Sequence, residues 1–349
     1  MGKEGNGMKP IRVLVVDDSV FFRNVLVQCL RTDPYIEVVA EAGDAYQARD
    51  AILKYRPDVM TLDVEMPRMN GIDFLRKLMP QYPLPVVVVS SLGGKVFEAM
   101  EAGAVDFVSK PAGMDRRQLS NFVKFELITK IKIASTAKVG NLKKVKPTVL
   151  GNGCKKKNDT NTIIAIGAST GGTEAILEVL KQFDRDIPGI VMVQHMPVGF
   201  TKMYAERLNN LCQIAVKEAQ TGDKVLPGQA LLAPADRQMR VVKVGDSYQV
   251  ECRGTERVSG HCPSVDVLFQ SVAKSVGKNA IGVILTGMGE DGANGLLAMR
   301  KAGARTIGQD EKSCVVYGMP KVAYEMGAVQ YQLSLTSVAG KIYGILKNK

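Results

Sequence analysis

Residues 166–172, with the sequence IGASTGG, place a serine between glycines where an apolar run meets a helical pattern. The Gly167-x-Ser169-x-Gly171 spacing is typical of a tight strand-to-helix turn that exposes a serine nucleophile. Such a turn can instead bind phosphate, but Ser169 occupies the second glycine position of a dinucleotide fingerprint, and the lysine of a P-loop is missing. A serine here can also cap a helix, so a catalytic role requires a base and an acid nearby.

Histidine is the usual base for a serine nucleophile, and the chain has two. His195 ends the apolar run IPGIVMVQH, which follows the predicted strand of Ser169. Side chains at the ends of neighbouring parallel strands can meet, so this position suits a base. His261, in the segment SGHCPSVD, precedes a predicted helix and suits a capping or surface role as well. We therefore favour His195 as the base and keep His261 as the alternative.

The acid that orients the base must come from another strand end. Asp291 follows an apolar strand and a glycine-rich loop in LTGMGEDG, and it precedes a helix. Glu290 and Asp266 remain alternatives, although Asp266 could simply cap the helix that starts nearby. Backbone N–H groups of Thr170 and Met288 lie on turns suited to an oxyanion hole. The resulting order of serine, histidine and aspartate differs from that of α/β-hydrolases, but such sites are defined by roles and not by order.

A second set of polar residues follows the ends of predicted strands in the N-terminal part of the chain: Asp17, Asp18, Asp63, Ser90 and Lys110. Carboxylates that converge in one pocket repel each other, so a hard divalent cation such as Mg²⁺ should bind among them. A nearby lysine then suits a phosphoryl group.

The elements that would position both sets are short buried strands alternating with helices. In the N-terminal part, five apolar runs fit this description: 11–16, 37–42, 58–63, 85–91 and 105–111. This alternation predicts an α/β fold with a doubly wound parallel sheet, in which ligands bind beyond the carboxyl ends of the strands. The C-terminal part again predicts α/β structure with a mainly parallel sheet, from runs at 162–167, 187–195 and 280–287.

Length and charge indicate two domains joined by a basic linker. A chain of 349 residues is long for one core. The net charge of +11 is concentrated in residues 128–162, where nine lysines face one acidic residue. This segment has no sustained period after about Lys138 and no interleaved aromatic residues, so we interpret it as a solvated tether. Without a basic recognition helix, the chain is not expected to bind nucleic acid, and a transcription factor is disfavoured.

Composition also bears on the compartment. No apolar run approaches the ~20 residues of a membrane helix, and the N-terminus lacks the apolar segment of a secretory signal, so no membrane insertion is expected. Zinc-site spacing does not occur among the scattered cysteines, which are Cys29, Cys154, Cys212, Cys252, Cys262 and Cys314. We expect reduced thiols in a cytoplasmic protein.

The polar residues at the strand ends of the first domain resemble those of response-regulator receiver domains, and the resemblance covers residues 10–127. The resemblance implies a flavodoxin-like fold in which Asp63 accepts a phosphoryl group from a histidine kinase. Asp58 is the competing acceptor, but it begins its strand and does not end it, so we reject it. Mg²⁺ would be held by Asp17, Asp18 and the backbone carbonyl of Glu65 together with Asp63. The resemblance further implies that Ser90 and Lys110 contact the phosphoryl oxygens. The aromatic switch position falls on Phe107, which lacks the hydroxyl of the commoner tyrosine.

Four segments of the second domain, in order behind a receiver, are similar to the chemotaxis protein-glutamate methylesterase (CheB) family: IGASTGG, VQHMP, HCPSVDVLF and LTGMGEDGANG. This resemblance implies a catalytic domain over residues 162–349 behind a linker at 128–161, with Ser169, His195 and Asp291 as the catalytic triad. It implies hydrolysis of glutamyl methyl esters on the cytoplasmic helices of chemoreceptors, with release of methanol, and deamidation of receptor glutamines. No cofactor is implied for the esterase, and we expect a monomer.

In this family, the unphosphorylated receiver obstructs the active site, and phosphorylation by the chemotaxis histidine kinase relieves the obstruction. We expect the same regulation here, because a tether of ~35 residues would hold the receiver at roughly millimolar effective concentration over the second domain. The alternative is a receiver-controlled binding or adaptor protein whose second domain has no catalytic activity.

Overall fold

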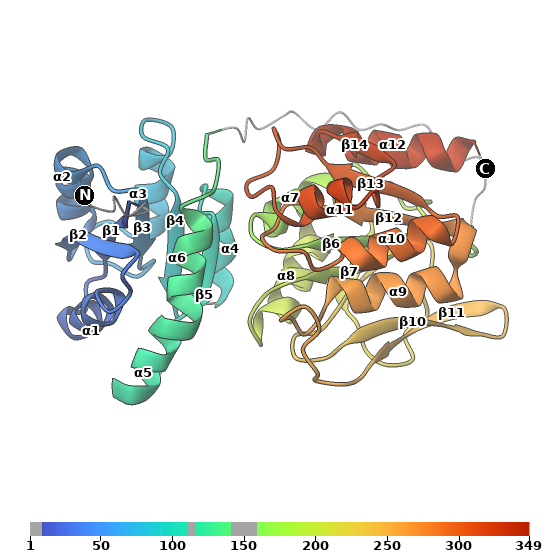
Figure 1. The fold of residues 1–349 in the computed structure, drawn as a ribbon, viewed down its shortest axis with the longest axis horizontal. Helices are drawn as coiled ribbons and strands as arrows, with labels where there is room; N and C mark the ends of the chain where they lie inside the picture. The colour runs from blue at the N-terminus through green and yellow to red at the C-terminus, as the bar shows by residue number, and fades with distance from the viewer. Residues whose placement is uncertain (1–8, 92, 111–112, 114–115, 141–158, 349) are drawn as a thin grey trace, which may run out of the picture. The chain divides into compact units, whose positions relative to one another are not determined.

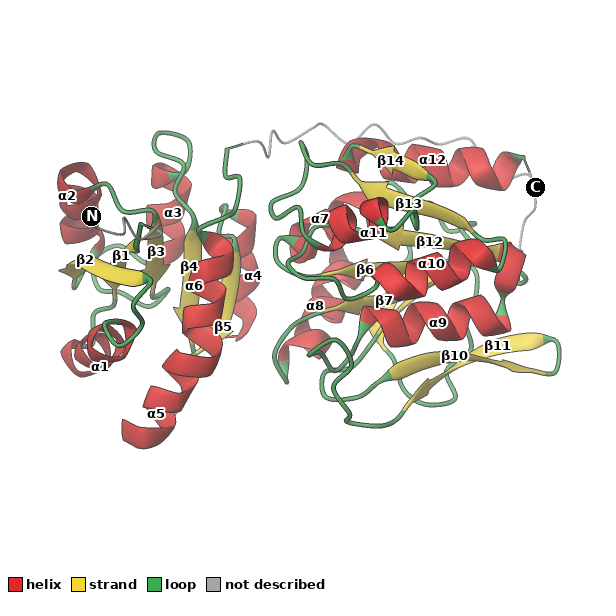
Figure 2. Cartoon of the chain, in the orientation of Figure 1, coloured by secondary structure: helices red, strands yellow, loops and turns green. Residues whose placement is uncertain are grey.

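The computed structural model describes residues 9–91, 93–110, 113, 116–140 and 159–348 (Figure 1). The chain divides into two compact units, residues 1–140 and 141–349. Figure 2 shows that each unit contains a sheet flanked by helices. No helix within the described ranges is both long and apolar enough to cross a membrane. The predicted basic linker falls largely on residues 141–158, which lie outside the described residues.

The first unit is a five-stranded sheet in the order β2-β1-β3-β4-β5, with every pairing parallel. Its strands are β1 (Ile11–Val16), β2 (Ile36–Ala42), β3 (Val59–Leu62), β4 (Val86–Ser90) and β5 (Asp106–Ser109). The order reverses between β1 and β3, so the carboxyl ends of these strands border the crevice where such sheets bind ligands. The predicted doubly wound sheet is therefore confirmed.

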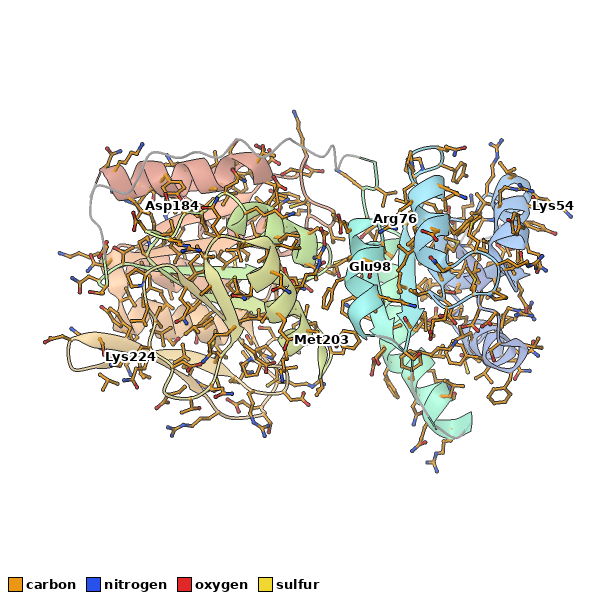
Figure 3. The ribbon with its side chains drawn as sticks, turned by 180° about the vertical axis from the view of Figure 1, so that it is seen from behind. Lys54, Arg76, Glu98, Asp184, Met203 and Lys224 are labelled. Atoms are coloured by element: carbon orange, nitrogen blue, oxygen red, sulfur yellow. The ribbon has the colours of Figure 1, made fainter. Side chains whose placement is uncertain are left out.

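Four helices pack around this sheet: α1 (Val20–Leu30), α2 (Ala45–Tyr55), α3 (Gly71–Leu78) and α4 (Gly93–Glu101). Polar side chains cap the N-termini of the first three. The Ser19 hydroxyl accepts the Phe22 N–H at 3.3 Å, and Asp44 and Asn70 cap α2 and α3 in the same way. Figure 3 shows Arg76 of α3 facing Glu98 of α4, and their charged atoms are 4.0 Å apart. Both side chains are exposed, so this pair contributes little to stability.

The last helix of the first unit extends beyond the boundary predicted at residue 127. It runs through α5 (Arg116–Phe122), a π-helical segment (Val123–Leu127) and α6 (Ile128–Ala134). Ile131 is fully buried, and two lysines counted with the linker make ion pairs with the unit: Lys130 with Asp106 at 2.8 Å and Lys132 with Asp33 at 2.7 Å. The start of the predicted linker is therefore wrong, because apolar packing and ion pairs hold residues 128–134 on the first unit.

The second unit is a seven-stranded sheet in the order β14-β13-β12-β6-β7-β9-β8, and all of its pairings are parallel. Its strands are β6 (Ile163–Ala168), β7 (Gly189–Gln194), β8 (Ala215–Glu218), β9 (Gln229–Leu232), β12 (Ala280–Ile284), β13 (Arg305–Gln309) and β14 (Tyr331–Leu333). An antiparallel hairpin of β10 (Met239–Val244) and β11 (Ser247–Cys252) forms a separate small sheet.

Three central strands, β12, β6 and β7, are buried along their whole length. Both faces of these strands are covered by helices, which explains why their sequences are continuous apolar runs and not alternating ones. Because the three strands are parallel neighbours, the loops that follow them converge at one edge of the sheet. The loop after each strand carries one of the predicted triad residues.

Helices cover both faces of the sheet of the second unit: α7 (Gly172–Leu180), α8 (Phe200–Leu211), α9 (Val265–Ser275), α10 (Ala293–Lys301), α11 (Met319–Glu325) and α12 (Leu335–Lys347). In Figure 1, α9 and α10 lie side by side, and these two helices pack together. α12 packs on α7. After α7, the Asp184 N–H donates to the hydroxyl of Tyr343 of α12 at 2.9 Å, and Figure 3 labels Asp184 beside α12.

Candidate active site

Ser169 lies in the turn that joins β6 to α7 and is 8% exposed. Gly171 has φ = 76°, a left-handed conformation that costs glycine little. Gly172 approaches β7 so closely that a Cβ would lie 2.1 Å from Gln194 Oε1. The turn closes with a 2.7 Å hydrogen bond from the Gly172 N–H to the Ser169 carbonyl. The glycines after the serine therefore allow this turn to form.

Thr286, two residues after the end of β12, holds the serine turn at two points. Its carbonyl accepts the Ser169 N–H at 3.0 Å, and its hydroxyl donates to the Thr170 carbonyl at 3.0 Å. The buried Gln309 in turn accepts the Thr286 N–H at 2.8 Å. Thr286 and Gln309 were not predicted from the sequence. In the sequence, LTG is the end of an apolar run, and nothing in the spacing shows which neighbour the threonine hydroxyl contacts.

The strand register brings Ser169 and His195 to the same edge. Ala168 of β6 pairs with Gln194 of β7, so the next residue of each strand leaves the sheet at the same level. The His195 N–H donates to the Ala168 carbonyl at 3.2 Å. The His195 imidazole then contacts the loop after β12, with its Nε2 2.8 Å from Asp291 Oδ2. The base and acid favoured from the sequence are thus in contact.

Asp291 is buried at the N-terminus of α9. Its carboxylate accepts hydrogen bonds from the Ser264 hydroxyl at 2.7 Å, the Val265 N–H at 2.7 Å and the Asp266 N–H at 3.0 Å. Burial opposes the charged form of Asp291. The hydrogen bond and charge of His195, together with the hydrogen bonds from Ser264 and the Asp266 N–H, outweigh this effect and lower the pKa of Asp291. A helix N-terminus also favours an anion, so Asp291 is a carboxylate near neutral pH.

The two imidazole nitrogens of His195 have different surroundings. An ionised carboxylate only accepts hydrogen bonds, so Nε2 carries the proton that points at Asp291. In a neutral imidazole the lone pair then lies on Nδ1. Nδ1 is buried and has no hydrogen-bond partner among the described residues. Nδ1 is the atom that can accept a proton, whereas the familiar arrangement has the acid on Nδ1 and the base at Nε2.

His261 lies on the other side of the base. Its ring stacks on that of His195, with centroids 3.7 Å apart and planes inclined by 8°. The sequence prediction kept His261 as an alternative base, or as a capping or surface residue. The structure places it in the same site as His195, but in contact with the face of the base and not at the acid. No spacing rule could have shown this, because the contact depends on the path of the loop before α9.

The two alternatives to Asp291 as the acid take other positions. Glu290 is exposed. Asp266 is buried, but its carboxylate accepts the Gly295 N–H at 2.6 Å and the Ser259 hydroxyl at 3.3 Å. Burial raises the pKa of Asp266, and the charge of Asp291 adds to this increase. Asp266 therefore serves as a support between the loop before α9 and the start of α10.

The two residues predicted for the oxyanion hole lie on the turns around Ser169. Thr170 follows the serine and is buried, and Met288 follows Gly287, whose carbonyl accepts the N–H groups of Gly318 and Met319 at 3.0 and 2.8 Å. The two turns are linked through Thr286, as described above. The oxyanion hole stays a prediction, since it concerns a charge that develops only during a reaction.

The first unit carries the acidic cluster predicted at its strand ends. Carboxylate oxygens of Asp17, Asp18 and Asp63 all lie within 4.8 Å of one another, and Lys110 Nζ is 2.8 Å from Asp17 and 2.7 Å from Asp63. Burial raises the pKa of Asp17 to about 6, although Lys110 opposes this increase. A buried carboxyl group whose pKa is raised by burial fits a divalent metal site, because a bound Mg²⁺ would favour its charged form.

The remaining residues predicted for this cluster lie nearby or pack against it. Ser90 ends β4 and is fully buried, and the Glu65 N–H donates to Asp63 at 3.0 Å. Phe107 is buried against Phe97, with ring centroids 6.1 Å apart. Asp58 is exposed and accepts the Arg12 N–H at 2.9 Å, at the opposite end of β3 from Asp63. Rejecting Asp58 agrees with this position.

A parallel α/β unit that brings a serine, a histidine and an aspartate to one edge of its sheet, behind a receiver-like unit, is the arrangement expected of a receiver-linked hydrolase. The family model described as CheB methylesterase matches residues 164–342, and the response regulator receiver domain matches residues 13–123. The chain therefore belongs to the CheB methylesterase family.

Relatives agree with this assignment over nearly the whole chain. The protein-glutamate methylesterase/protein-glutamine glutaminase 2 of Syntrophomonas wolfei is 59% identical over 97% of this chain and 98% of the relative. The corresponding protein of Salmonella typhimurium is 50% identical over 95% of this chain and 96% of the relative. Among solved structures, the CheB methylesterase catalytic domain of Thermotoga maritima matches with a TM-score of 0.52 and 34% identity, covering 53% of this chain and 98% of that one.

Proposed function

We propose that this protein hydrolyses γ-glutamyl methyl esters on the cytoplasmic helices of chemoreceptors, releases methanol, and deamidates receptor glutamines, under the control of receiver phosphorylation. The observation that carries the chemistry is the 2.8 Å contact between His195 Nε2 and Asp291, with Nδ1 buried and unpartnered among the described residues. The substrate class is supported by the names of relatives that span nearly the whole chain.

The first half-reaction forms an acyl-enzyme. Ser169 Oγ attacks the ester carbonyl while His195 Nδ1 accepts the hydroxyl proton, and Asp291 stabilises the imidazolium that results. The carbonyl oxygen becomes an oxyanion that the N–H groups of Thr170 and Met288 stabilise. The bond to the methoxy group then breaks, and the imidazolium donates its proton so that methanol leaves. The glutamyl group remains bound to Ser169 as an ester.

The second half-reaction reverses these roles with water as the nucleophile. His195 Nδ1 accepts a proton from water, the hydroxide adds to the acyl carbonyl, and Ser169 leaves with that proton. The products are the glutamate side chain and the free enzyme. A glutamine substrate follows the same path, with ammonia leaving in place of methanol. The name glutaminase in the relatives supports this second reaction.

Phosphorylation of the first unit provides the control. Asp63 accepts the phosphoryl group from a histidine kinase, and Lys110 pairs with the phosphoryl oxygens instead of with the free carboxylates. Ser90, at the end of β4, hydrogen-bonds one of these oxygens. Phe107 has no hydroxyl, so any change at this position is one of ring packing and not of hydrogen bonding. The unphosphorylated receiver restrains the second unit, and the added negative charge relieves this restraint.

The acidic cluster is proposed to hold Mg²⁺ through Asp17, Asp18 and Asp63, with the backbone carbonyl of Glu65 as a further ligand. When bound, the cation neutralises charge on the phosphoryl group during transfer. The protein's own contribution is to present the Asp63 carboxylate in line with the donor and to supply the cation of Lys110. No cofactor is proposed for the esterase, because proton transfer by His195 accounts for its steps.

Methanol release from a methylated chemoreceptor fragment tests this function. We expect the full chain to release methanol, and a small-molecule phosphodonor with Mg²⁺ to raise the rate. Ser169→Ala should abolish release, and Asp63→Asn should abolish only the response to the phosphodonor. Release by Ser169→Ala at the wild-type rate would exclude Ser169 as the nucleophile. If the wild type binds the fragment but releases no methanol under any condition, the protein is a phosphorylation-controlled adaptor instead.

A further inference from the structure

The imidazole of His195 has a polar contact at one end only. Nε2 is held by Asp291, while Nδ1 has no partner within the described structure. A single hydrogen bond fixes the position of one ring atom but leaves the ring free to tilt about it. The near-parallel ring of His261, 3.7 Å away between centroids, covers one face of the imidazole. This contact resists a tilt toward that side, because the two rings would overlap.

The loop that carries His261 is itself held at several points. Val258 and His261 exchange two backbone hydrogen bonds of 3.0 and 2.9 Å. The fully buried Gln238 donates from Nε2 to the carbonyls of Glu256 at 2.7 Å and His261 at 3.2 Å. The other end of the same amide accepts the Ser264 N–H at 2.9 Å. The backbone on both sides of His261 is therefore fixed to one buried side chain.

The same segment also holds the triad acid. Three residues beyond His261, Ser264 begins the run of three donors to Asp291. Asp266, which ends this run, accepts the Ser259 hydroxyl at 3.3 Å and so connects the run back to the loop. The segment 258–266 thus has two roles around the His195 ring. It supports Asp291 at one end of the ring, and it holds the His261 imidazole against one face of the ring.

We propose that His261 is a positioning residue for the catalytic base. Its ring keeps the His195 imidazole in the plane that joins Nε2 to Asp291 and directs Nδ1 toward the serine turn. The role depends on a flat ring of this size and not on hydrogen bonding or charge at position 261. The proposal rests on the proposed function, in which His195 Nδ1 accepts the proton of Ser169.

Two substitutions in the full chain separate this role from others. His261→Ala removes the ring, and His261→Phe restores a flat ring that has no polar atoms. Cys262→Ser is the matched control, because it changes the next residue of the same loop without altering the stack. Since the chain has two histidines, either His261 variant leaves His195 as the sole source of imidazole signals. Histidine-selective ¹⁵N labelling then reports the ring state of His195 directly.

The reactivity of Ser169 is measured as its labelling rate with a fluorophosphonate, which needs the activated hydroxyl but no receptor. We expect His261→Ala to lower this rate about 10- to 100-fold, as misplacement of a catalytic group by about 1 Å does. His261→Phe should restore most of the rate, and Cys262→Ser should leave it unchanged. For methanol release, kcat should fall in His261→Ala while KM stays the same. The His195 ring signals should broaden in His261→Ala and sharpen again in His261→Phe.

Wild-type labelling and unchanged His195 signals in His261→Ala would overturn the proposal. A His261→Phe variant as slow as His261→Ala would also overturn it, because a polar or charged role would then be required at this position. If the wild-type chain is not labelled by the reagent even with the phosphodonor and Mg²⁺ present, the proposed function fails at Ser169. The His195 signals would still decide separately whether the ring of residue 261 restrains that of residue 195.

Discussion

The side-chain amide of Gln194 donates a hydrogen bond to the carbonyl of Ser169 at 2.9 Å. The same nitrogen also donates to the carbonyl of His195 at 3.0 Å. One buried amide at the end of β7 thus links the backbone of the proposed nucleophile to that of the proposed base. The link crosses from one strand to its neighbour, so it fixes the separation of the two loops independently of the substrate.

Replacement of Gln194 should therefore affect the reaction as well as stability. We expect Gln194→Leu to lower the free energy of unfolding by about 1–3 kcal/mol, since the Ser169 and His195 carbonyls each lose the hydrogen bond from this amide. It should also lower kcat by about 10- to 100-fold through misplacement of the two loops. Gln182→Leu is the matched control, because Gln182 is buried just beyond the C-terminal end of α7 and donates to the Glu178 carbonyl at 2.9 Å. Equal loss of kcat in both variants would contradict this role of Gln194.

Asp291 should be required for catalysis in its charged form. Asp291→Asn replaces an acceptor of several hydrogen bonds by an amide that can hold His195 in the wrong tautomer, and the expected loss in kcat is about 10³- to 10⁴-fold. The exposed neighbour Glu290 provides the control, and Glu290→Gln should retain the wild-type rate. Steady-state methanol release measures both variants. A loss shared equally by Glu290→Gln would show that charge near the site, and not the contact with His195, is what matters.

The lowered pKa of Asp291 also predicts how acid affects stability. An acidic group whose pKa is lowered on folding stabilises the folded protein at pH values above its ordinary pKa of 3.8. This contribution is lost as the pH falls below 3.8 toward the lowered pKa of the folded state. Chemical denaturation of wild type and Asp291→Asn between pH 3 and pH 6 measures the difference. The two free energies of unfolding should converge at the acidic end of this range. A gap that stays constant across the range would contradict the assigned direction of the shift.

Much of the fold, and the convergence of the three residues proposed as the triad, could be predicted from the sequence. Continuous apolar runs identify buried parallel strands, and the carboxyl ends of such strands meet at one edge of the sheet. Ser169, His195 and Asp291 each follow such a run, so their convergence follows from topology alone. The extension of the first unit to Ala134 was missed because the lysines between Ile128 and Ala134 suggested a solvated tether. Its ion pairs with Asp33 and Asp106 involve partners far away in the chain.

The residues that support the triad could not be predicted in the same way. Thr286, Gln309, Gln194 and His261 act through hydrogen bonds or ring contacts between loops, and these contacts depend on the exact path of each loop. Polar residues of these types are common in loops, where they usually contact solvent or cap helices. Only the tertiary structure shows which of them face the site, because neither periodicity nor spacing encodes a contact between two loops.

Thr286 offers a test of how the serine turn is held. Thr286→Val keeps the shape of the side chain but removes the hydroxyl that donates to the Thr170 carbonyl and accepts the Val316 N–H at 2.9 Å. We expect a loss of about 1–3 kcal/mol in the free energy of unfolding and a lower kcat, because the turn that presents Ser169 loses one of its two supports. Thr286→Ser retains the hydroxyl and should recover kcat. Equal activity of the valine and serine variants would contradict the support by the hydroxyl.

The acidic cluster of the first unit predicts a link between pH, Mg²⁺ and stability. Burial raises the pKa of Asp17 to about 6 from 3.8, so in the absence of metal the folded protein holds a proton there that the unfolded chain has released. The free energy of unfolding should therefore decrease as the pH rises from about 4 to about 6, by roughly 2–3 kcal/mol in total. Asp17→Asn, which has no proton to release, should lack this decrease.

A bound divalent cation should reverse the effect, because it favours the charged carboxylates. Mg²⁺ at 100 times its dissociation constant should add about 2.7 kcal/mol at pH 7.5. It should add much less at pH 5, where Asp17 retains its proton and competes with the metal. Calorimetry of the full chain with and without Mg²⁺ at both pH values measures this difference, with Asp58→Asn as a control that changes an exposed acid at the opposite end of β3. Equal stabilisation at pH 5 and pH 7.5, or wild-type stabilisation of Asp17→Asn, would show that the cation binds elsewhere.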